Sequence, residues 1–520
     1  MLLLYLWYIF KVKGIFMSYD YMLGSNDSKS VDFDRILSIS YLFGFKTKFD
    51  NLKILEIGCG DGIRLIAAAE GNPNNVYVGI SDCSDIIQNN QHIIEELGLA
   101  NINLYDMSLE SFLEANSIIF DLVIVNNVYS WVDQNSQIII LNILEKYLAA
   151  NGLVFIDYNT MPGWHMQNAL RGMIQHHVQS YPDKTEKIKQ AKSFLRFLKE
   201  NSTSGKEEKE LLIYEISAID RLSDASFYRE FISENNWPIY FSNMVGKLNL
   251  FNLAYIGDYD LKTMSSQDMP KEAQDALILS PNLIESEQYM DFFRNRRGRK
   301  SIICRAEAAI ASQSGLDPTK LYDMNLSANN LLISSNVNDL CNNEPLSLNI
   351  GGEFDLTITD PLVKVALKIL TDHSPGQLSF HNLLLSSSEC LSISGCNSNT
   401  EEQKEVLAYQ LLLLYSCLTA RTIDVTVNKR HIASYIHHSP KASKSSRLLA
   451  GSSGPIMNLN LCAVSLDENE RKILCLLDGS LTYAKIVDAF EGSFGGEVVD
   501  KSGYVLATLN KFLNHALLVN

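Results

Sequence analysis

The chain has 520 residues, of which 46% are hydrophobic and 20% charged, and its formal net charge at pH 7 is −16. This length is too great for one hydrophobic core and predicts two to four domains, while the composition excludes general disorder. The acidic balance argues against broad binding to nucleic acid or to anionic membranes, because both need a basic surface. It suits a basic partner, such as a lysine-rich segment of another protein, although solubility alone also explains it.

The nine cysteines are scattered and form no CxxC pair. This pattern is typical of reduced thiols in a cytoplasmic protein, so we expect neither disulfides nor a structural metal. Residues 1–16, MLLLYLWYIFKVKGIF, are apolar and then basic. They are too short to span a bilayer and lack the leading charge and cleavage site of a signal peptide. We interpret them as a disordered upstream extension or a loose membrane-surface tag, and we predict no stable membrane insertion.

Apolar runs and helical patterns alternate through the first 160 residues. Such alternation predicts an α/β fold with a parallel, Rossmann-like sheet covered on both faces, including helices at Gly62–Ala69 and Ile86–Glu96. Residues 165–237 then carry apolar residues at helical spacing and predict a helical insertion. After the insertion we expect a helix at Ile239–Leu250. The seven expected strands are Lys53–Ile57, Val76–Ile80, Ile102–Tyr105, Asp121–Asn126, Gly152–Tyr158, Leu253–Gly257 and Lys300–Arg305.

Beyond residue 320 the pattern changes and repeats weakly. FDLTITDPLVKVALKIL and LCAVSLDENERKILCLLDG each predict a strand, an Asp-led helix start and a helix. Further helices are expected at Glu401–Arg421 and Lys501–Leu518. We therefore predict two small winged-helix-like α+β modules, at residues 321–438 and 455–520, after a first domain of residues 17–164 plus 238–310. Residues 386–398 are interpreted as a loop and residues 439–454 as a linker.

Residues 54–62, ILEIGCGDG, join the first strand to the helix that follows it. A dinucleotide-binding turn has the spacing G-x-G-x-x-G and places a pyrophosphate at a helix N-terminus. Here the glycines stand at 58, 60 and 62, and Glu56 precedes them in the strand, where its charge would repel a phosphate. The acid suits the ammonium end of a methionine moiety. We predict that Glu56, Gly58, Cys59, Gly60 and Gly62 hold a cofactor without phosphates.

The spacing resembles the E/D-x-G-x-G-x-G turn of class I S-adenosylmethionine-dependent methyltransferases, in which an acid after the second strand binds the ribose. Here Ser81 stands at that position and Asp82 one residue later, and a shift by one residue points a side chain to the opposite face of a strand. Either residue remains a candidate for the ribose. Asp106 would bind the adenine amino group or cap a helix, with Met107 packing near the ring. Ser108 and Asn126 complete the expected cofactor site.

The fourth strand ends in NNVYSW, at residues 126–131. It has neither the [N/D]-P-P-[Y/F] sequence of many amino-methylating enzymes nor the Pro-Cys nucleophile of cytosine-C5 enzymes. Tyr129 and Trp131 predict an aromatic lip beside the methyl donor, because aromatic faces stabilise a cation and confine a long amine stem. The alternative is that both rings are half-buried packing residues.

The fifth strand runs into YNTMPGWH, at residues 158–165. This sequence, VYSW at 128–131, SFYREF at 226–231, IESEQYMDFFRNRRGRKS at 284–301 and ILCLLDG at 473–479 resemble bacterial methyltransferases that carry a methyltransferase regulatory domain. The best-known members are rickettsial protein-lysine methyltransferases that act on outer membrane protein B. The resemblance covers nearly the whole chain from Met17. It departs at Ser81, at Met161 in place of a tyrosine and at Arg229 in place of a histidine.

The resemblance implies methylation of the lysine ε-amino group by S-adenosylmethionine, outer membrane protein B as the substrate, and a homodimer for which residues 165–237 offer a surface. Deprotonating a lysine at pH 7 costs about 4–5 kcal/mol. A desolvating aromatic channel reduces this cost and alignment of the amine with the methyl group supplies much of the remainder, so we expect no essential base. The acceptor-side candidates are Tyr129, Trp131, Tyr158, Asn159 and His165, of which His165 has an equally plain structural interpretation at a helix start.

Two other functions fit the same residues. A small-molecule methyltransferase would leave the two hundred residues after 320 unexplained, and a non-catalytic binding protein would retain the fold without the cofactor. The dense basic run Arg294, Arg296, Arg297 and Arg299 is interpreted as a solvated hairpin connection, with contact to an acidic stretch of a substrate or second subunit as the alternative.

Overall fold

The computed structural model describes residues 31–81, 84–309, 315–328, 331, 333–350, 354–393, 400–417, 422–452, 454–490 and 500–519. The expected extension at residues 1–16 lies outside the described residues. None of the helices within the described ranges is long and apolar enough to cross a membrane.

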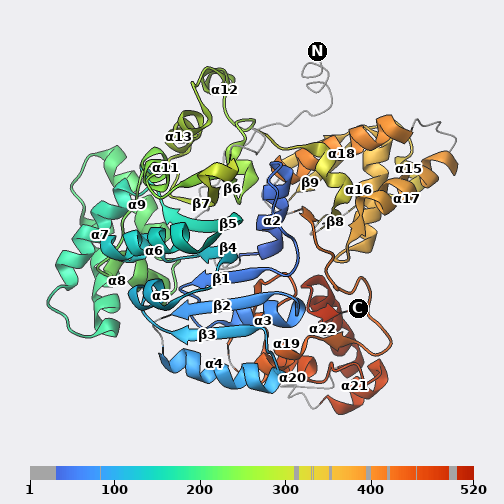
Figure 1. The fold of residues 1–520 in the computed structure, drawn as a ribbon, viewed down its shortest axis with the longest axis horizontal. Coiled ribbons are helices and arrows are strands. Elements are labelled where there is room, and N and C mark those ends of the chain that lie inside the picture. Colours follow the sequence, from blue (N-terminus) through green and yellow to red (C-terminus); the bar gives the residue numbers. More distant parts are fainter. Residues whose placement is uncertain are drawn as a thin grey trace.

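The centre of the molecule is a seven-stranded sheet in the order β3-β2-β1-β4-β5-β7-β6 (Figure 1). The first five strands of this order are parallel, and β7 runs antiparallel to both of its neighbours. The Rossmann-like α/β sheet predicted from the sequence is therefore confirmed. The strands are β1 (Lys53–Ile57), β2 (Val76–Ser81), β3 (Ile102–Asp106), β4 (Phe120–Val125), β5 (Leu148–Asn159), β6 (Leu253–Asp258) and β7 (Gly298–Arg305).

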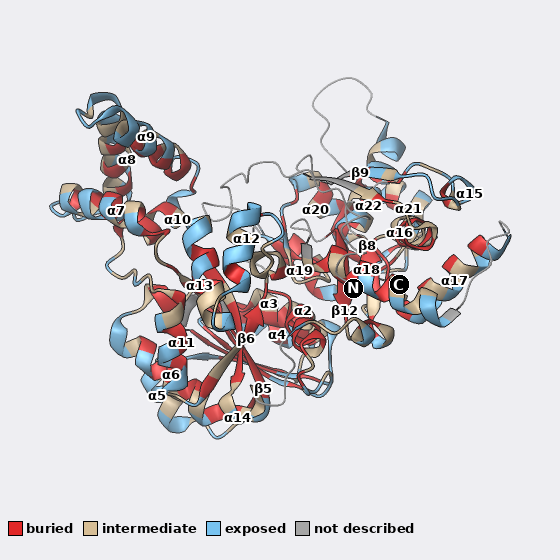
Figure 2. Cartoon of the chain, turned by 90° about the horizontal axis from the view of Figure 1, so that it is seen from above, coloured by how far each residue is buried: buried red, intermediate tan, exposed pale blue. Residues whose placement is uncertain are grey.

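Helices cover both faces of the sheet, as Figure 2 shows along its edge. One face carries α2 (Phe33–Leu42), α3 (Ile63–Gly71) and α4 (Ser84–Leu97), and the opposite face carries α5 (Leu109–Ala115), α6 (Gln134–Tyr147) and α11 (Phe241–Asn249). Alternate strand residues supply the two cores: Ile54 and Phe155 belong to the first, and Leu55 and Ile156 to the second. Successive residues of a strand point to opposite faces of the sheet, and here both faces are buried. The strands are therefore continuous apolar runs in the sequence.

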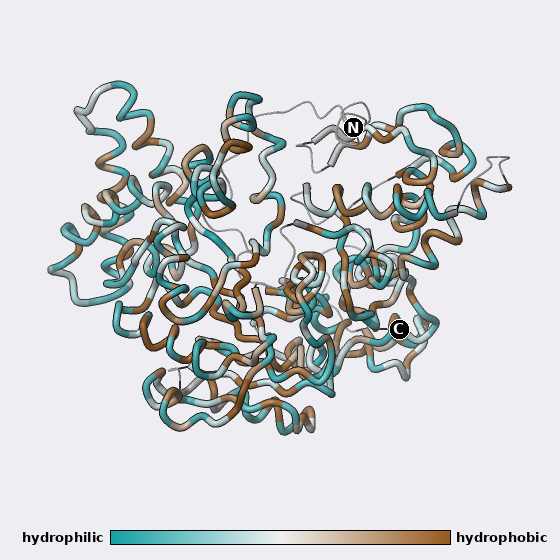
Figure 3. Tube along the Cα trace, turned by 45° about the horizontal axis from the view of Figure 1, so that its top comes forward, coloured by the Kyte–Doolittle hydropathy of each residue, from teal (hydrophilic) through white to brown (hydrophobic). Residues whose placement is uncertain are grey.

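The predicted helical insertion forms a separate bundle that projects from the sheet (Figure 2). It consists of α7 (His165–Val178), α8 (Lys184–Asn201), α9 (Lys206–Ile219), α10 (Asp224–Phe227) and a π-helical turn, η4 (Tyr228–Ile232). The bundle has its own core, which includes Leu170, Ile174, Leu195, Ile216 and Phe231. Hydrophilic residues lie along its outer turns (Figure 3), as expected for helices with one apolar stripe.

The arginine side chains of the basic run at 294–299 are largely buried and ion-paired, so its interpretation as a solvated connection is wrong. It joins α13 (Leu283–Arg294) to β7, after α12 (Lys271–Ile278) and the 3-10 turn η5 (Leu261–Met264). Arg299 has no exposed side-chain surface and forms ion pairs with Asp258, Glu287 and Asp291 at 2.9–3.0 Å. Buried charges must be paired to be tolerated. The three carboxylates come from β6 and α13, and local sequence patterns do not show that these elements pack beside β7.

The middle part of the chain combines small sheets with helices, in agreement with the expected α+β character. A three-stranded sheet contains β8 (Asn325–Ala328), β11 (Leu378–Ser379) and β12 (Ile423–Thr426), and β9 (Leu346–Ile350) pairs with β10 (Phe354–Ile358). The helices and 3-10 turns of this region and of the connection before it are α14 (Ala306–Ala309), η6 (Pro318–Asp323), α15 (Val337–Leu340), α16 (Pro361–His373), α17 (Phe380–Ile393) and α18 (Thr400–Cys417).

The serine-rich loop expected at 386–398 is helical as far as Ile393, and residues 394–398 lie outside the described part. Ser387 donates its hydroxyl to the Leu383 carbonyl at 2.7 Å, and Ser392 does the same to Ser388 at 2.8 Å. Serine hydroxyls that bond back to the preceding turn are compatible with a helix. Leu383 and Leu391 are buried beside them, and this burial outweighs the low helix propensity of serine.

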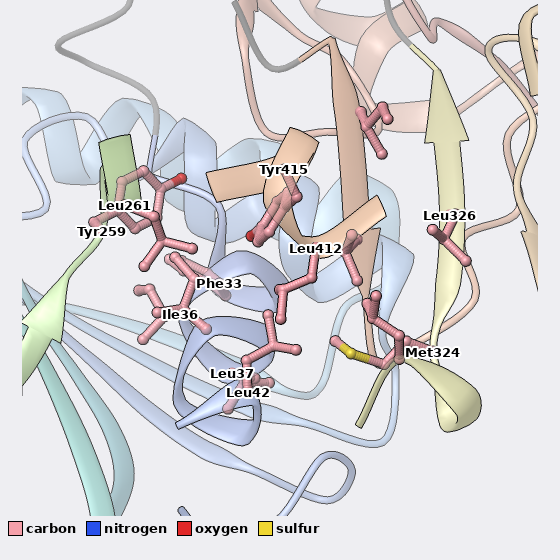
Figure 4. Close-up of a cluster of buried hydrophobic side chains, with 14 of the residues drawn as sticks. Phe33, Ile36, Leu37, Leu42, Tyr259, Leu261, Met324, Leu326, Leu412 and Tyr415 are labelled. Atoms are coloured by element: carbon pink, nitrogen blue, oxygen red, sulfur yellow. The ribbon is translucent and has the colours of Figure 1, made fainter. Parts of the chain in front are cut away.

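Helix α2 joins the sheet to the middle region (Figure 4). Its Phe33, Ile36 and Leu37 lie between Tyr259 and Leu261 on the sheet side and Leu412 and Tyr415 of α18 on the other, within one hydrophobic core. Next to this core, Arg430 forms ion pairs with Asp32 at 2.6 Å and with Asp34 at 3.3 Å. The middle region therefore shares its core with the sheet.

The expected linker at 439–454 is wrong, because it contains β13 (Lys441–Ala442) and α19 (Lys444–Ala450). The backbone N–H groups of Lys444 and Ser445 donate to the Glu70 carboxylate at 2.7 and 2.8 Å, so a residue of α3 caps this helix. The remaining elements are β14 (Ile456–Met457), β15 (Ala463–Val464), α20 (Glu468–Cys475), α21 (Tyr483–Ala489), α22 (Lys501–Asn514) and β16 (Leu518–Val519).

Replacing Arg299 by methionine is expected to destabilise the protein by about 3–5 kcal/mol, because the substitution leaves buried carboxylates without their cation. The measurement is the free energy of unfolding in urea. The matched control is Lys271→Met, which removes an exposed i,i+4 pair with Asp275 at 2.6 Å and should cost less than about 0.5 kcal/mol. Equal effects of the two substitutions would contradict a structural role for the Arg299 cluster.

Candidate active site

A row of five residues crosses the carboxyl ends of the five parallel strands. The register pairs Ser81 with Asp106 and brings Gly58, Asn126 and Asp157 level with them, one residue beyond the last paired positions of β1 and β4. We call these five residues the strand-end row. Ligands of open α/β sheets bind beyond the carboxyl ends of the strands, so the row marks the candidate active site.

The glycine turn between β1 and α3 has a backbone that other residues adopt only under strain. Gly58, Gly60 and Gly62 have φ values of 71°, 59° and 68°, in the left-handed region that favours glycine. A Cβ on Gly58 would lie 2.3 Å from Val128 Cγ2, whereas one on Gly60 would meet nothing within 4 Å. The N–H groups of Gly58 and Cys59 donate to the Ile80 carbonyl at 2.9 and 3.1 Å. The turn is thus tied to β2 and leaves open space above Gly60.

Glu56 lies at the end of β1 and is 2% exposed. One of its oxygens forms an ion pair with Arg64, in the first turn of α3. Its other oxygen, Oε2, is buried and has no hydrogen-bond partner within the described residues. Leaving a buried acceptor unpaired is costly, so this carboxylate is well suited to receive a donor from a bound molecule. The sequence did not predict this ion pair, because Glu56 lies in a strand and Arg64 in the helix after the turn.

Cys59 is a buried thiol rather than a reactive one. It is 8% exposed, and burial, with the nearby Glu56 carboxylate, raises the pKa of the thiol to about 12. A thiol in this state carries no thiolate at neutral pH. Its backbone, which shapes the turn, is the part that faces the site.

The residues expected near ribose and adenine lie at the ends of β2 and β3. Ser81 is 7% exposed and its carbonyl accepts the Met107 N–H at 3.1 Å, while Asp106 is exposed at the rim. Ser108 caps α5 by accepting the Ser111 N–H at 3.2 Å, so the capping role considered for Asp106 belongs to Ser108. Asp82, the other ribose candidate, lies outside the described residues.

The lip after β4 contains the predicted aromatic residues. Asn126 directly follows β4, and Asn127 has a φ of 59°, which turns the chain into a short 3-10 helix, η3 (Tyr129–Trp131). The Asn126 Oδ1 and the Tyr129 hydroxyl are both buried without a hydrogen-bond partner in the part of the chain that the structure describes. Burial also raises the pKa of the Tyr129 phenol. The Tyr129 phenol therefore remains neutral at pH 7, and both residues keep a polar atom available to a bound molecule.

Trp131 is contacted by a ring and by a cation. The Trp164 ring meets it edge-on at a centroid distance of 5.9 Å, and the Arg229 guanidinium lies over its face at 5.3 Å. Arg229 comes from η4, far from the strand ends in sequence. Its position on an aromatic face shows that this lip accommodates a cation.

A segment after the insertion, residues 235–240, forms a second wall. Its Trp237 N–H donates to the Ser130 carbonyl at 2.9 Å and its Ile239 N–H to the Asn159 carbonyl at 3.0 Å. The Asn159 amide donates to Asn236 Oδ1 at 2.8 Å. Asn159, an expected acceptor-side residue, is therefore the link between β5 and this wall.

The two other acceptor-side candidates have different surroundings. The Tyr158 hydroxyl is buried and lies 3.1 Å from Ser301 Oγ, next to the Arg299 cluster. Burial raises the pKa of this phenol. His165 begins α7, is exposed, and lies 3.4 Å from the Tyr240 hydroxyl. Of the five candidates, the structure brings Tyr129, Trp131 and Asn159 together.

Asp157 ends the strand-end row and was missed by the sequence analysis. Its carboxylate accepts the Asn127 N–H. Burial raises the pKa of the carboxyl to about 6, opposed by the Asn127 N–H and by the charges of Lys300, Arg229 and Arg64. Asp157 immediately precedes the YNTMPGWH sequence at residues 158–165. It was missed because it lies within the fifth strand, whereas the candidates were taken from the residues after it.

The expected S-adenosylmethionine fits this arrangement. Glu56 Oε2 offers an unpaired acceptor for an ammonium group, the space over Gly60 admits a molecule close to the backbone, and Asn126 and Tyr129 have unsatisfied polar atoms at the same end of the sheet. These residues line the side of the strand-end row on which the cofactor is expected.

Comparisons with known proteins agree with this geometry. Residues 48–214 match a family model described as "Methyltransferase domain", and residues 223–305 match one described as "Predicted methyltransferase regulatory domain". The second match contains η4, the wall at 235–240, β6 and β7. The segment named regulatory therefore completes the sheet and builds one side of the site.

Relatives come from Rickettsia. Protein RP789 of Rickettsia prowazekii is 27% identical over 411 residues, which are 78% of this chain and 73% of that protein. Protein RP028 of the same organism is 34% identical over 214 residues, which are 40% of this chain and 84% of that protein. Both are uncharacterized.

Solved structures of PKMT2 from Rickettsia typhi are similar over almost the full length. One matches with a TM-score of 0.82 at 24% identity, covering 96% of this chain and 99% of PKMT2. The other, a complex with AdoHcy, matches with a TM-score of 0.81 at 26% identity and covers 95% and 99% of the two chains.

The substitution Gly58→Ala is expected to lower the free energy of unfolding by more than Gly98→Ala. Both glycines have φ near 70°, at 71° and 70°, so both alanines incur the same left-handed strain of about 1–2 kcal/mol. Only Gly58 adds a collision with Val128, since nothing lies within 4 Å of a Cβ on Gly98. Urea unfolding of the two variants measures the difference, and Val128→Ala in the Gly58→Ala background should recover part of it.

Proposed function

This chain belongs to the methyltransferases that join a methyltransferase domain to a methyltransferase regulatory domain, and on that premise we propose that it methylates the ε-amino group of lysine in a large protein substrate, with S-adenosylmethionine as the donor. The observation that carries the proposal is the likeness to the protein-lysine methyltransferase PKMT2 in its AdoHcy complex, which extends over 95% of this chain. The modules beyond the sheet are included in that likeness.

The donor would lie across the strand-end row. Glu56 would accept its ammonium group, Ser81 or Asp82 its ribose hydroxyls, and Asp106 its adenine amino group, with Gly58, Cys59, Gly60, Gly62 and the residues Met107, Ser108 and Asn126 around it. The donor supplies a methyl carbon that a sulfonium has already activated. The protein therefore has to bind, align and desolvate the acceptor amine.

The acceptor would enter over the aromatic lip. The half-buried Trp131 offers a surface that strips water from an ammonium, and the Tyr129 ring, which is buried in the core, supports this lip. Desolvation favours the neutral amine that reacts. Arg229, already on the face of Trp131 at 5.3 Å, adds a like charge that disfavours the ammonium form. Asn159 and the wall at 235–240 hold this lip in place.

Partners follow from the same resemblance. A net charge of −16 suits a lysine-bearing substrate, and we propose outer membrane protein B or a similar envelope protein, modified in the cytoplasm before export. We also propose a homodimer that uses the insertion, whose α8 and α9 expose Phe197, Leu211 and Tyr214. Exposed apolar residues on one bundle favour contact with another protein chain.

The test is transfer of labelled methyl groups from S-adenosylmethionine to an envelope protein fraction, followed by mass spectrometry of the labelled sites. Label on lysine side chains is the expected result, because the lip accommodates a cation. Label confined to small metabolites would favour the small-molecule alternative. Absence of both label and S-adenosylhomocysteine binding in calorimetry would favour a non-catalytic protein.

The variant Gly60→Leu is expected to weaken S-adenosylhomocysteine binding at least 100-fold and to abolish labelling, because its side chain enters the open space over the turn. Gly98→Leu is the matched control: φ is 59° at Gly60 and 70° at Gly98, and neither has an atom within 4 Å of an added Cβ. The control should bind and label like the parent. Unchanged binding by Gly60→Leu would show that the donor lies elsewhere.

A further inference from the structure

We propose that the Asp157 carboxylate binds the ε-ammonium group of the acceptor lysine and takes its proton before methyl transfer. This inference rests on the proposed function and gives it a chemical group that the sequence analysis did not expect. It stands on the position of Asp157 at the end of the strand-end row and on the groups that surround its carboxylate.

The sheet register places Asp157 on the same face of the sheet as Glu56 and on the other side of β4 from it. Glu56 and Phe155 are both level with Ile124 of β4, so Asp157, two residues beyond Phe155, points to the same face of the sheet as Glu56. Glu56 is the candidate for the donor's ammonium, and one strand separates it from Asp157. If the donor's ammonium lies at Glu56, the transferred methyl group has to point towards the acceptor. Asp157 is on β5, the last parallel strand on that side of β1.

Asp157 also contacts the lip directly. Its carboxylate accepts the N–H of Asn127, the residue whose φ of 59° turns β4 into the aromatic helix η3. Asn126 and Tyr129, on either side of this residue, have buried polar atoms without partners in the described ranges. The carboxylate thus lies at the junction between the strand-end row and the surface over which an amine would approach.

The charges of three cations act on the Asp157 carboxylate, and each cation is paired with a different carboxylate. Lys300 of β7 lies 3.3 Å from Asp260, Arg229 of η4 lies 3.4 Å from Glu230, and Arg64 of α3 pairs with Glu56. No salt bridge to Asp157 is formed within the described part of the chain. Asp157 is therefore a half-buried carboxylate near several cations, and its own ion-pair position remains open, as a site for a substrate ammonium requires.

The proton balance of the step is complete. The Asp157 carboxylate accepts one proton from the lysine ammonium and becomes a neutral carboxylic acid, and the nitrogen keeps the freed electron pair. That pair forms the bond to the methyl carbon while the carbon–sulfur bond breaks and its electrons remain on sulfur as a neutral thioether. The product nitrogen carries the positive charge, and the carboxylic acid returns its proton to solvent.

The acid–base match favours this role. Burial raises the pKa of Asp157 to about 6, which makes it a stronger base than an exposed aspartate while it stays ionised at neutral pH. The pKa of a free lysine is near 10.4, and desolvation at the lip together with the charge of Arg229 lowers it towards that of the carboxyl. These effects narrow the difference in pKa that the proton transfer has to overcome.

The test compares the full-length parent, Asp157→Asn and Asp157→Glu across pH 6–10, with kcat/KM for lysine labelling and the Kd for S-adenosylhomocysteine as readouts. Asparagine retains an oxygen for the Asn127 N–H but cannot take the proton. We expect Asp157→Asn to bind S-adenosylhomocysteine within twofold of the parent and to lose about 100-fold in kcat/KM at pH 7. The loss should shrink towards pH 10, where solvent deprotonates the lysine.

The parent profile should fall as pH drops through about 6, because protonation of Asp157 removes the base. Asp157→Glu keeps a carboxylate and should retain this acid limb at a lower rate, whereas Asp157→Asn should lack it. The matched control is Asp133→Asn, at an exposed position that caps α6 through the N–H groups of Asn135 and Ser136. Asparagine caps equally well, so this variant should behave like the parent.

Three results would overturn the inference. An equal loss for Asp157→Asn at pH 7 and pH 10 would mean that the residue only supports the lip. A loss of S-adenosylhomocysteine affinity as large as the loss of rate would make Asp157 a donor ligand. An unchanged rate would remove it from the reaction. A parent that labels no lysine at all would instead refute the proposed function, and the two failures are thus distinguishable.

Discussion

The parallel register of β1 with its neighbours β2 and β4 is the constraint on which the site depends. It brings residues that are 20 to 99 positions apart in the sequence into one row at the carboxyl ends of the strands. A slip by one residue would turn Glu56 and Asp157 to the opposite face. Register is held because β1, β2, β4 and β5 alternate between two buried cores, so each slip would exchange one set of packed side chains for another.

The sheet and the regulatory segment are one structure. Strands β6 and β7 belong to the segment matched as the regulatory domain, and β7 pairs directly with β5, which carries Asp157 and Asn159. The Arg299 cluster ties α13 to this added pair of strands. The wall at 235–240 comes from the same segment. This wall is joined to the aromatic lip after β4 and to the end of β5 by backbone hydrogen bonds, so a change in its packing reaches both.

Local patterns were enough to predict the strands and the glycine turn, because both depend on residues close together in the chain. The β1 strand occurs at the predicted residues, Lys53–Ile57, and the predicted turn follows it, with all three glycines at positive φ. The buried state of Arg299, the pairing of Arg64 with Glu56 and the position of Arg229 on Trp131 could not be predicted in this way. Each depends on a partner brought from a different element by tertiary packing, and charged residues read alone indicate solvent exposure.

The C-terminal part of the chain packs directly against the helices that follow the first two strands. Ile63, the residue directly after Gly62, packs against the C-terminal hydrophobic core together with Ile93 of α4. Glu70 of α3 caps α19 from the same side. Removal of this part would expose both isoleucines and leave the Glu70 carboxylate without those donors. These residues belong to α3 and α4, the helices that follow β1 and β2. The glycine turn is thus held by hydrogen bonds to β2, and the helix that follows it packs against residues almost four hundred positions later. Segments from both ends of the chain therefore contribute to the shape of one short loop.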